Sequence, residues 1–254
     1  MDPRLTAFKR LLDIMDDLRA KCPWDKKQTL ESLRYLTLEE VYELSDAILS
    51  ADMEEVKKEL GDVMLHLVFY AKIASESNCF DITDVLNGIC DKLVHRHPHI
   101  YGDVKVASEE EVKANWEKLK LKEGKKSVME GVPKSLPAMV KSIRIQEKAR
   151  GMGFDWDNRQ QVWQKVKEEI VEFEIEQKAK DSQKSQEEFG DLLFSLINYS
   201  RFVSINPEDA LERTNKKFIK RFQYIESQLE KESLKMEDLT LDQLDEYWNK
   251  AKSI

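Results

Sequence analysis

Glu39-Glu40-Val-Tyr-Glu43 and Glu59-Leu-Gly-Asp62 make up an acidic pattern that the chain contains twice. The second copy reads Glu168-Glu169-Ile-Val-Glu172 and Glu188-Phe-Gly-Asp191, and each of its acids lies 129 positions after its counterpart. In each half of the pattern two acids are three residues apart, which places both on one face of a helix. The repeat therefore predicts two copies of one helical unit.

The acids of each copy are arranged symmetrically about one position. Glu40 and Asp62 are centred on residue 51, and the corresponding acids of the second copy are centred on residue 180. An antiparallel helical hairpin with its tip near that position would bring the four acids together, ~12 Å below the tip at a rise of ~1.5 Å per residue. The spacing thus predicts an acidic helical hairpin in each half of the chain.

Length, charge and cysteine usage limit the class of protein. The chain has 254 residues, many charged residues and few Gly or Pro, which is typical of a soluble helical protein with two modest domains. The net charge of -8 disfavours a nucleic-acid polymer as a partner. Cys22, Cys79 and Cys90 lack metal-ligand spacing, so we expect reduced thiols. No signal-peptide pattern or bilayer-length apolar run is found, so we expect a cytoplasmic protein without a membrane partner.

Helix-breaking and capping residues divide the chain. We expect a domain over residues 1–122, a linker over residues 123–137 and a second domain over residues 138–254. Asp52 and Glu55 have the spacing of a capping box that starts a helix. Strand patterns are absent, so the predicted fold is all-α, with two homologous helical domains. The expected helices cover about residues 5–20, 29–49, 53–74, 81–95, 108–122, 139–150, 162–178, 185–203 and 207–229, and a last helix contains Tyr247-Trp248.

The candidate ligands in both acidic clusters are carboxylate oxygens, because no Cys or His recurs in the pattern. Such sets suit Mg²⁺, for which Mn²⁺ can substitute, and disfavour zinc and iron. A di-iron carboxylate bundle usually pairs Glu with His at i, i+3, and neither copy contains that pair. The alternative is a solvated helix face. Apolar residues among the acids favour the metal site, since partly buried carboxylates are costly without a cation.

These motifs resemble the MazG-type nucleoside triphosphate pyrophosphohydrolases, which belong to an all-α nucleotide pyrophosphatase superfamily. Besides the two acidic patterns, the resemblance rests on Cys22-Pro-Trp-Asp25, Arg96-His-Pro-His99, Gly153-Phe-Asp-Trp156 and Asn215-Lys-Lys-Phe218. It covers essentially the whole chain and implies Mg²⁺-dependent hydrolysis of nucleoside triphosphates to the monophosphate and pyrophosphate. It also implies a homodimer, in which hairpins from both subunits build each four-helix-type bundle.

The resemblance assigns roles to particular residues of the second copy. The implied metal ligands are Glu169, Glu172, Glu188 and Asp191, with a second set, intact or degenerate, at Glu40, Glu43, Glu59 and Asp62. The implied substrate-binding residues are Lys165, Glu168, Lys184, Lys217, Arg221 and Trp248. Among these acids, Glu168, Glu169 and Glu172 are the candidate catalytic residues. A carboxylate beside the metal ligands can orient the attacking water, which is the role expected of Glu168.

The two copies differ in their cations. Lys165 corresponds to Leu36 and Lys184 corresponds to Glu55, so the first copy keeps the acids without two of the lysines. A triphosphate needs such cations, because acids alone would repel it. We therefore expect the main activity in the C-terminal domain, with weak, altered or no turnover in the N-terminal one.

Two broad functions follow from these features. The leading prediction is a nucleotide-pool house-cleaning enzyme with broad base specificity. The alternative is a catalytically weak helical protein that senses nucleotides or acts as a scaffold. The intact second acidic set with its lysines favours the enzyme.

His66 and Trp116 have simpler interpretations. His66 lies four residues after Asp62, but its counterpart is Ser195, so we interpret it as a packing or dimer-interface residue. Trp116 and Trp248 lie at matching ends of the domains. We expect Trp116 to pack internally.

Overall fold

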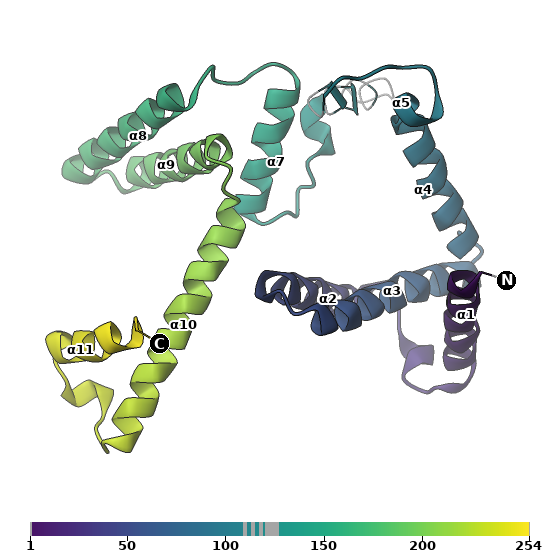
Figure 1. The fold of residues 1–254 in the computed structure, drawn as a ribbon, viewed down its shortest axis with the longest axis horizontal. Coiled ribbons are helices and arrows are strands. Elements are labelled where there is room, and N and C mark those ends of the chain that lie inside the picture. The colour runs from purple at the N-terminus through teal and green to yellow at the C-terminus, as the bar shows by residue number, and fades with distance from the viewer. Residues whose placement is uncertain (1, 109–110, 113–114, 117–118, 120–126, 254) are drawn as a thin grey trace. The chain divides into compact units, whose positions relative to one another are not determined.

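The computed structural model of the chain describes residues 2–108, 111–112, 115–116, 119 and 127–253. Within these residues every regular element is a helix, as Figure 1 shows. The predicted all-α fold is therefore confirmed. No helix in this described part is both long and apolar enough to cross a membrane.

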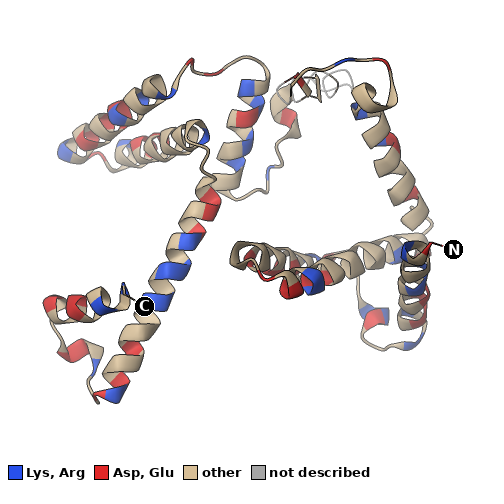
Figure 2. Cartoon of the chain, viewed as in Figure 1, with Lys and Arg blue, Asp and Glu red and all other residues tan. Residues whose placement is uncertain are grey.

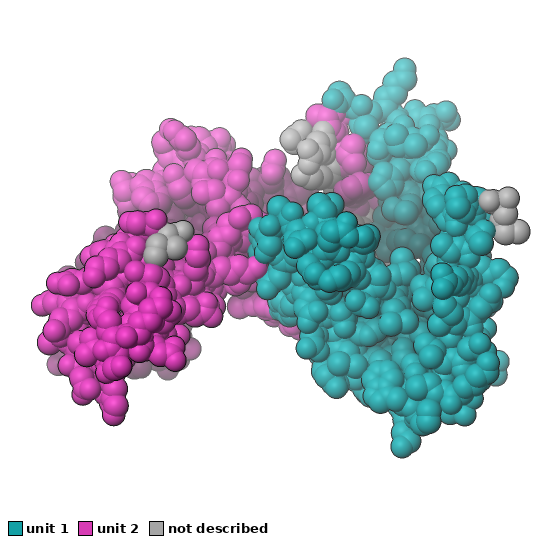
Figure 3. Space-filling model, turned by 60° about the horizontal axis from the view of Figure 1, so that its bottom comes forward, with its two compact units in different colours: residues 1–107 teal, residues 108–254 magenta. Residues whose placement is uncertain are grey.

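The chain forms two compact units, residues 1–107 and residues 108–254, which Figure 3 colours separately. Much of the predicted helix over residues 108–122 and the first part of the predicted linker over 123–137 fall outside the described residues, so the domain limits stay a prediction. The first unit contains α1 (Pro3–Lys21), η1 (Asp25–Lys27), α2 (Leu30–Ser50), α3 (Met53–Glu76), α4 (Ile82–Arg96) and α5 (Pro98–Tyr101). The second contains η2 (Val128–Gly131), α7 (Ala138–Gly151), α8 (Arg159–Ala179), α9 (Ser182–Phe202), α10 (Pro207–Lys231), η3 (Met236–Asp238) and α11 (Leu241–Ala251).

Each unit contains the predicted hairpin, formed by α2 with α3 and by α8 with α9. Its tip is a single left-handed residue at the centre of symmetry: Ala51 has φ 57° and Lys180 has φ 59°. The next residues, Asp52 and Asp181, accept backbone hydrogen bonds from the first turn of the following helix. The acidic spacing thus located both turns to the residue.

The predicted capping box at Asp52 is only half formed. The Asp52 carboxylate accepts from the amides of Glu54 and Glu55. The Glu55 side chain pairs with Lys58 instead of returning a bond to the cap. A cap made by Asp52 alone is sufficient to start α3.

The first helix of each unit packs against the second helix of its hairpin. In the first unit α1 meets α3 and η1, and Met15, Leu33, Val68 and Phe69 form the buried core. In the second unit α7 meets α9, while α10 packs against α7 and α11. The hairpins also carry apolar side chains that are about half exposed, which are Val41, Ile48, Leu60, Leu67, Val171, Ile175, Phe189 and Leu193.

Candidate metal and nucleotide site

The hairpins gather three acids of each predicted set. Carboxylate oxygens of Glu169, Glu172 and Glu188 all lie within 4.8 Å of one another. Glu40, Glu43 and Glu59 form the same arrangement in the first unit. The fourth acid of each set, Asp62 or Asp191, lies outside these groups. Three convergent carboxylates can provide ligands for a divalent cation.

In the part of the chain that the structure describes, no lysine or arginine forms an ion pair with the first cluster (Glu40, Glu43 and Glu59). Burial raises the pKa of Glu40, and the charges of Asp62, Glu43 and Glu39 raise it further. Burial likewise raises the pKa of Glu59, helped by Glu43 and Asp62. The Oε2 atom of Glu59 is buried without a hydrogen-bond partner among the described residues. An orphaned carboxylate oxygen beside two other acids fits a hard cation.

The second cluster (Glu169, Glu172 and Glu188) is partly neutralised by a lysine. Nζ of Lys165 lies 2.7 Å from Oε1 of Glu168 and 2.8 Å from Oε1 of Glu169. These two hydrogen bonds raise the pKa of Lys165. The Glu169 residue is only 6% exposed, so Lys165 provides a partner for a carboxylate that is largely removed from water. Leu36 occupies the corresponding position of the first unit.

Opposing influences act on Glu172. Burial raises its pKa, the nearby charge of Lys165 lowers it, and the charges of Glu169, Glu168 and Glu188 raise it. The net direction is upward. The cluster therefore retains surplus negative charge despite Lys165, as expected of a site that also takes a metal ion.

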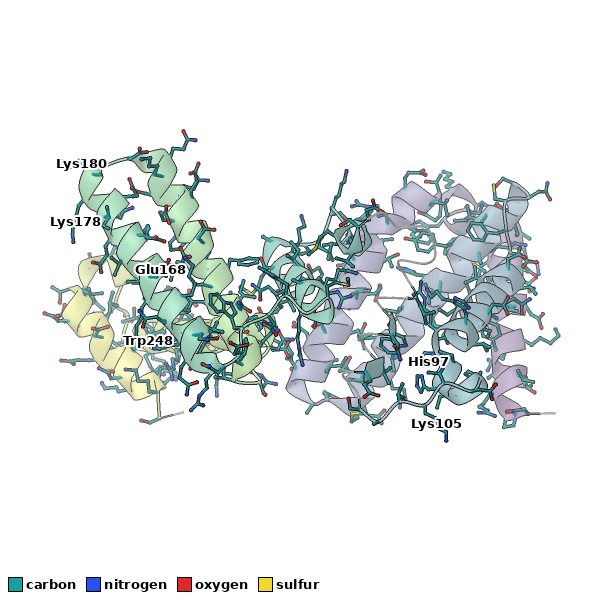
Figure 4. All side chains as sticks on the ribbon, turned by 90° about the horizontal axis from the view of Figure 1, so that it is seen from above. His97, Lys105, Glu168, Lys178, Lys180 and Trp248 are labelled. Atoms are coloured by element: carbon teal, nitrogen blue, oxygen red, sulfur yellow. The ribbon has the colours of Figure 1, made fainter. Side chains whose placement is uncertain are left out.

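Lys184 lies in the first turn of α9, where its amide donates to Asp181. No ion pair joins its ammonium to an acid within the described residues. Figure 4 labels Glu168 on α8, with Lys178 and Lys180 at the tip end of the same hairpin. The structure thus brings Lys165, but not Lys184, into contact with the acids.

The remaining expected cations lie on α10, where Figure 2 shows several Lys and Arg bands. The Arg221 guanidinium lies 5.4 Å from the ring centroid of Trp248, and Phe218 contacts the same ring at 5.0 Å. α10 packs against α7 and α11. Among the described residues, no ion pair joins Lys217 or Arg221 to the acidic cluster. Arg221 and Trp248 therefore belong to a separate group.

His66 is buried, and its Nδ1 lies 3.0 Å from Oγ1 of Thr37, which in turn lies 2.6 Å from the Tyr70 hydroxyl. Burial lowers the pKa of His66, and the charge of Asp62 opposes that shift. These contacts agree with a packing role. Trp116 is half-buried.

Gln146 of α7 is a buried polar residue that the acidic pattern did not identify. It is 5% exposed, and its Oε1 is buried without a hydrogen-bond partner in the described part of the chain. The repeat contained an indirect signal, because Asn198 stands where the first unit has Phe69. When a core position is polar in one copy and apolar in the other, this indicates that the two copies differ in function at that position.

Comparison with known proteins agrees with these features. The family model of the MazG nucleotide pyrophosphohydrolase domain matches residues 28–101 and 158–225, which contain the two hairpins. A Thermotoga maritima protein named nucleoside triphosphate pyrophosphohydrolase/pyrophosphatase MazG is 44% identical over 250 residues, covering 96% of this chain and 95% of that protein.

A second curated relative supports the same assignment, and one solved structure is also similar. The Escherichia coli (strain K12) nucleoside triphosphate pyrophosphohydrolase is 40% identical over 257 residues, covering 98% of each chain. The crystal structure of a MazG-related protein from Thermotoga maritima is 28% identical, with a TM-score of 0.41, and covers 44% of this chain and 98% of that one. From the matched domains and the full-length relatives, the chain belongs to the MazG nucleotide pyrophosphohydrolase family.

Proposed function

We propose that the chain hydrolyses nucleoside triphosphates to the monophosphate and pyrophosphate, with Mg²⁺ as cofactor and with the main activity at the second cluster. The names of its full-length relatives support the reaction. The observation that favours the second cluster is the contact of Lys165 with Glu168 and Glu169. A triphosphate brings negative charge to an already acidic site, so a cation beside the acids is required.

The metal ligands in this proposal are Glu169, Glu172 and Glu188, with Asp191 as the expected fourth. When bound, Mg²⁺ supplies positive charge for the phosphate oxygens and acidifies water. The acids hold it, and Lys165 exchanges its carboxylate partners for a phosphate oxygen. The first cluster offers the same ligand types without that lysine, so it is proposed to bind metal with little turnover.

Glu168 is proposed to orient the attacking water. Its side chain is 52% exposed and is paired with Lys165. When Lys165 turns to a phosphate oxygen, the carboxylate of Glu168 is released to accept from water. The water oxygen then bonds to the α-phosphorus as a proton of that water passes to the carboxylate of Glu168, the bond from the α-phosphorus to the oxygen that bridges to the β-phosphate breaks, and pyrophosphate leaves. The acids and Lys165 act on the phosphates and not on the base, which favours broad base specificity.

A homodimer is part of the proposal. Among the described residues, the second hairpin keeps the apolar side chains Val171, Ile175, Phe189 and Leu193 about half exposed. Lys217 and Arg221 lie on α10, which packs elsewhere in the same unit. A second copy can cover these apolar side chains and bring its own α10 cations to the acids.

Pyrophosphate release from a panel of nucleoside triphosphates with Mg²⁺ tests this function. We expect release from several bases. Lys165→Met should raise KM roughly tenfold, because a charged hydrogen bond to the substrate is lost. Lys178→Met, an exposed lysine on the same helix, is the control and should leave KM unchanged. Retained nucleotide binding with no release from any triphosphate would favour the sensing or scaffold function.

A further inference from the structure

A cavity of about 470 Å³ lies in the second unit, between α7, the segment that follows it and α9. Its lining includes Gln146, Phe154, Trp156, Asn198 and Arg201. The acidic cluster does not use these residues. The cavity combines polar groups on its helical walls with two aromatic rings.

Gln146 provides a hydrogen-bond acceptor with a fixed orientation. Its Nε2 donates to the backbone oxygen of Phe194 at 2.9 Å, which identifies the other amide atom as the oxygen. That Oε1 is buried and has no partner among the described residues. A buried acceptor without a donor is costly, so the side chain is suited to a ligand that carries an N–H group.

Asn198 provides the complementary donor. Its Oδ1 accepts from Nε and Nη2 of Arg201, at 3.2 Å and 2.7 Å, so its amide nitrogen is left to donate. Arg201 is also paired with Asp155, at 2.6 Å between Nη2 and Oδ1. Arg150 also lies 3.8 Å from Asp155, outside the lining, so the two charged side chains of the wall are paired with each other and neither is left without a partner. A neutral ligand fits such a wall better than a phosphate.

Phe154 and Trp156 add aromatic surface to the cavity. Phe154 is 83% exposed and Trp156 is 42% exposed, so both rings are accessible. Exposed aromatic faces are suited to stacking on a planar ring, and stacking tolerates different bases. Nucleobases are neutral planar rings that carry an N–H group beside an acceptor, so they match this lining.

The first unit shows that the hairpin does not need this polar lining. Phe69 stands at the position of Asn198 and is 2% exposed. It packs with Met15 in an apolar core. The polar cavity therefore distinguishes the second unit, which is also the unit with Lys165.

We propose that this cavity binds the base of the nucleotide whose phosphates lie at the second cluster, an inference that rests on the proposed function. Glu188, the α9 member of the second cluster, and Asn198 are ten residues and ~15 Å apart along the helix axis, and Asp191, the expected fourth ligand, lies on the same face as Asn198 and ~10 Å from it. The sugar and first phosphate of a nucleotide can span that separation. Gln146 Oε1 then accepts from the base, and every common base offers an N–H beside an acceptor, so the cavity requires a base without selecting one.

The test compares ATP with purine riboside triphosphate, whose base has no N–H. For the unmodified full-length chain we expect a lower KM for ATP. Gln146→Leu should raise the KM for ATP roughly three- to tenfold and leave that for purine riboside triphosphate unchanged. The inhibition constant of inorganic tripolyphosphate, which has no base, should not move.

Asn198→Phe provides a second variant, because it restores the residue of the first unit and fills the cavity. It should raise KM for both nucleotides and leave tripolyphosphate inhibition unchanged, with helical content checked by circular dichroism. The proposal is overturned if Gln146→Leu leaves the ATP preference intact, or if it weakens tripolyphosphate equally, which indicates a structural disturbance. If the unmodified chain releases no pyrophosphate, the proposed function fails first and the base site falls with it. Normal release with an unchanged preference overturns the base site alone.

Discussion

A single residue distinguishes the two acidic clusters electrostatically. Lys165 pairs with Glu168 and Glu169 in the second unit, whereas the first unit has Leu36 at that position. The acids repel one another in both hairpins, and in the second hairpin the contact with Lys165 partly neutralises them. Charge compensation, not the number of acids, separates the two sites.

Ionisation of Glu59 should oppose folding of the metal-free protein. Its pKa in the folded chain is raised above the usual 4.5, so the folded state holds its proton more tightly than the unfolded state does. Stability from this group is therefore lost as pH rises through the folded pKa. Glu59→Gln should raise Tm at pH ~7 and have little effect near pH ~4, below the unfolded pKa.

Thermal unfolding of the metal-free protein checks this expectation. Glu54→Gln is the control, since Glu54 lies on the same helix outside the cluster and pairs with Lys57. It should give no gain in Tm at neutral pH. An unchanged or lower Tm for Glu59→Gln at neutral pH contradicts the account of the first cluster.

At the scale of elements, the sequence predicted the hairpins better than their ends. The symmetric acids located the tips at Ala51 and Lys180. α8 begins at Arg159, earlier than expected, because Asn158 caps it before the first apolar residue, Val162. An apolar period marks where a helix packs, while a cap determines where it starts.

The sequence predicted only part of the site, because helical spacing fixes the face on which a residue lies and not where its side chain ends. Spacing placed Glu188 and Asp191 on one face of α9, yet only Glu188 joins the acids that lie within 4.8 Å. Helical period fixes a face and leaves the side-chain rotamer open. Gln146 was missed because its significance depends on a cavity and an unpaired atom, which no spacing rule describes.

The hairpin tips give a stability prediction at this scale. Lys180 adopts φ 59°, a conformation that costs a side-chain-bearing residue and suits Gly. Lys180→Gly should therefore stabilise the chain by about 1 kcal/mol in urea unfolding. Lys178→Gly, inside α8, should destabilise it by about 1 kcal/mol. Equal effects of the two substitutions would show that the tip conformation carries no strain.

At the scale of the whole molecule, the proposed dimer explains why the acids and the α10 cations belong to separate groups. The second hairpin carries half-exposed apolar side chains, among them Val171, Ile175, Phe189 and Leu193. Exposed apolar side chains of this kind favour association. If the partner supplies Arg221, each active site contains residues of both subunits.

Mixing two inactive variants tests that arrangement. Glu172→Ala removes an acid and Arg221→Ala removes an α10 cation, so each homodimer should be impaired. After subunit exchange, half of the dimers should be mixed, with one intact site in two, which restores about a quarter of the unmodified activity. No recovery in a sample shown to contain mixed dimers would place the acids and Arg221 in one subunit.

The central claim is that the second cluster carries the main activity, and matched substitutions in the two hairpins test it most directly. Glu172 and Glu43 occupy the same position in their clusters. With Mg²⁺ and a hydrolysed triphosphate, Glu172→Ala should lower kcat/KM at least about a hundredfold, since a metal ion contributes several kcal/mol to charge stabilisation. Glu43→Ala should retain most of the activity. Abolition of pyrophosphate release by Glu43→Ala, with Glu172→Ala still active, would contradict the account.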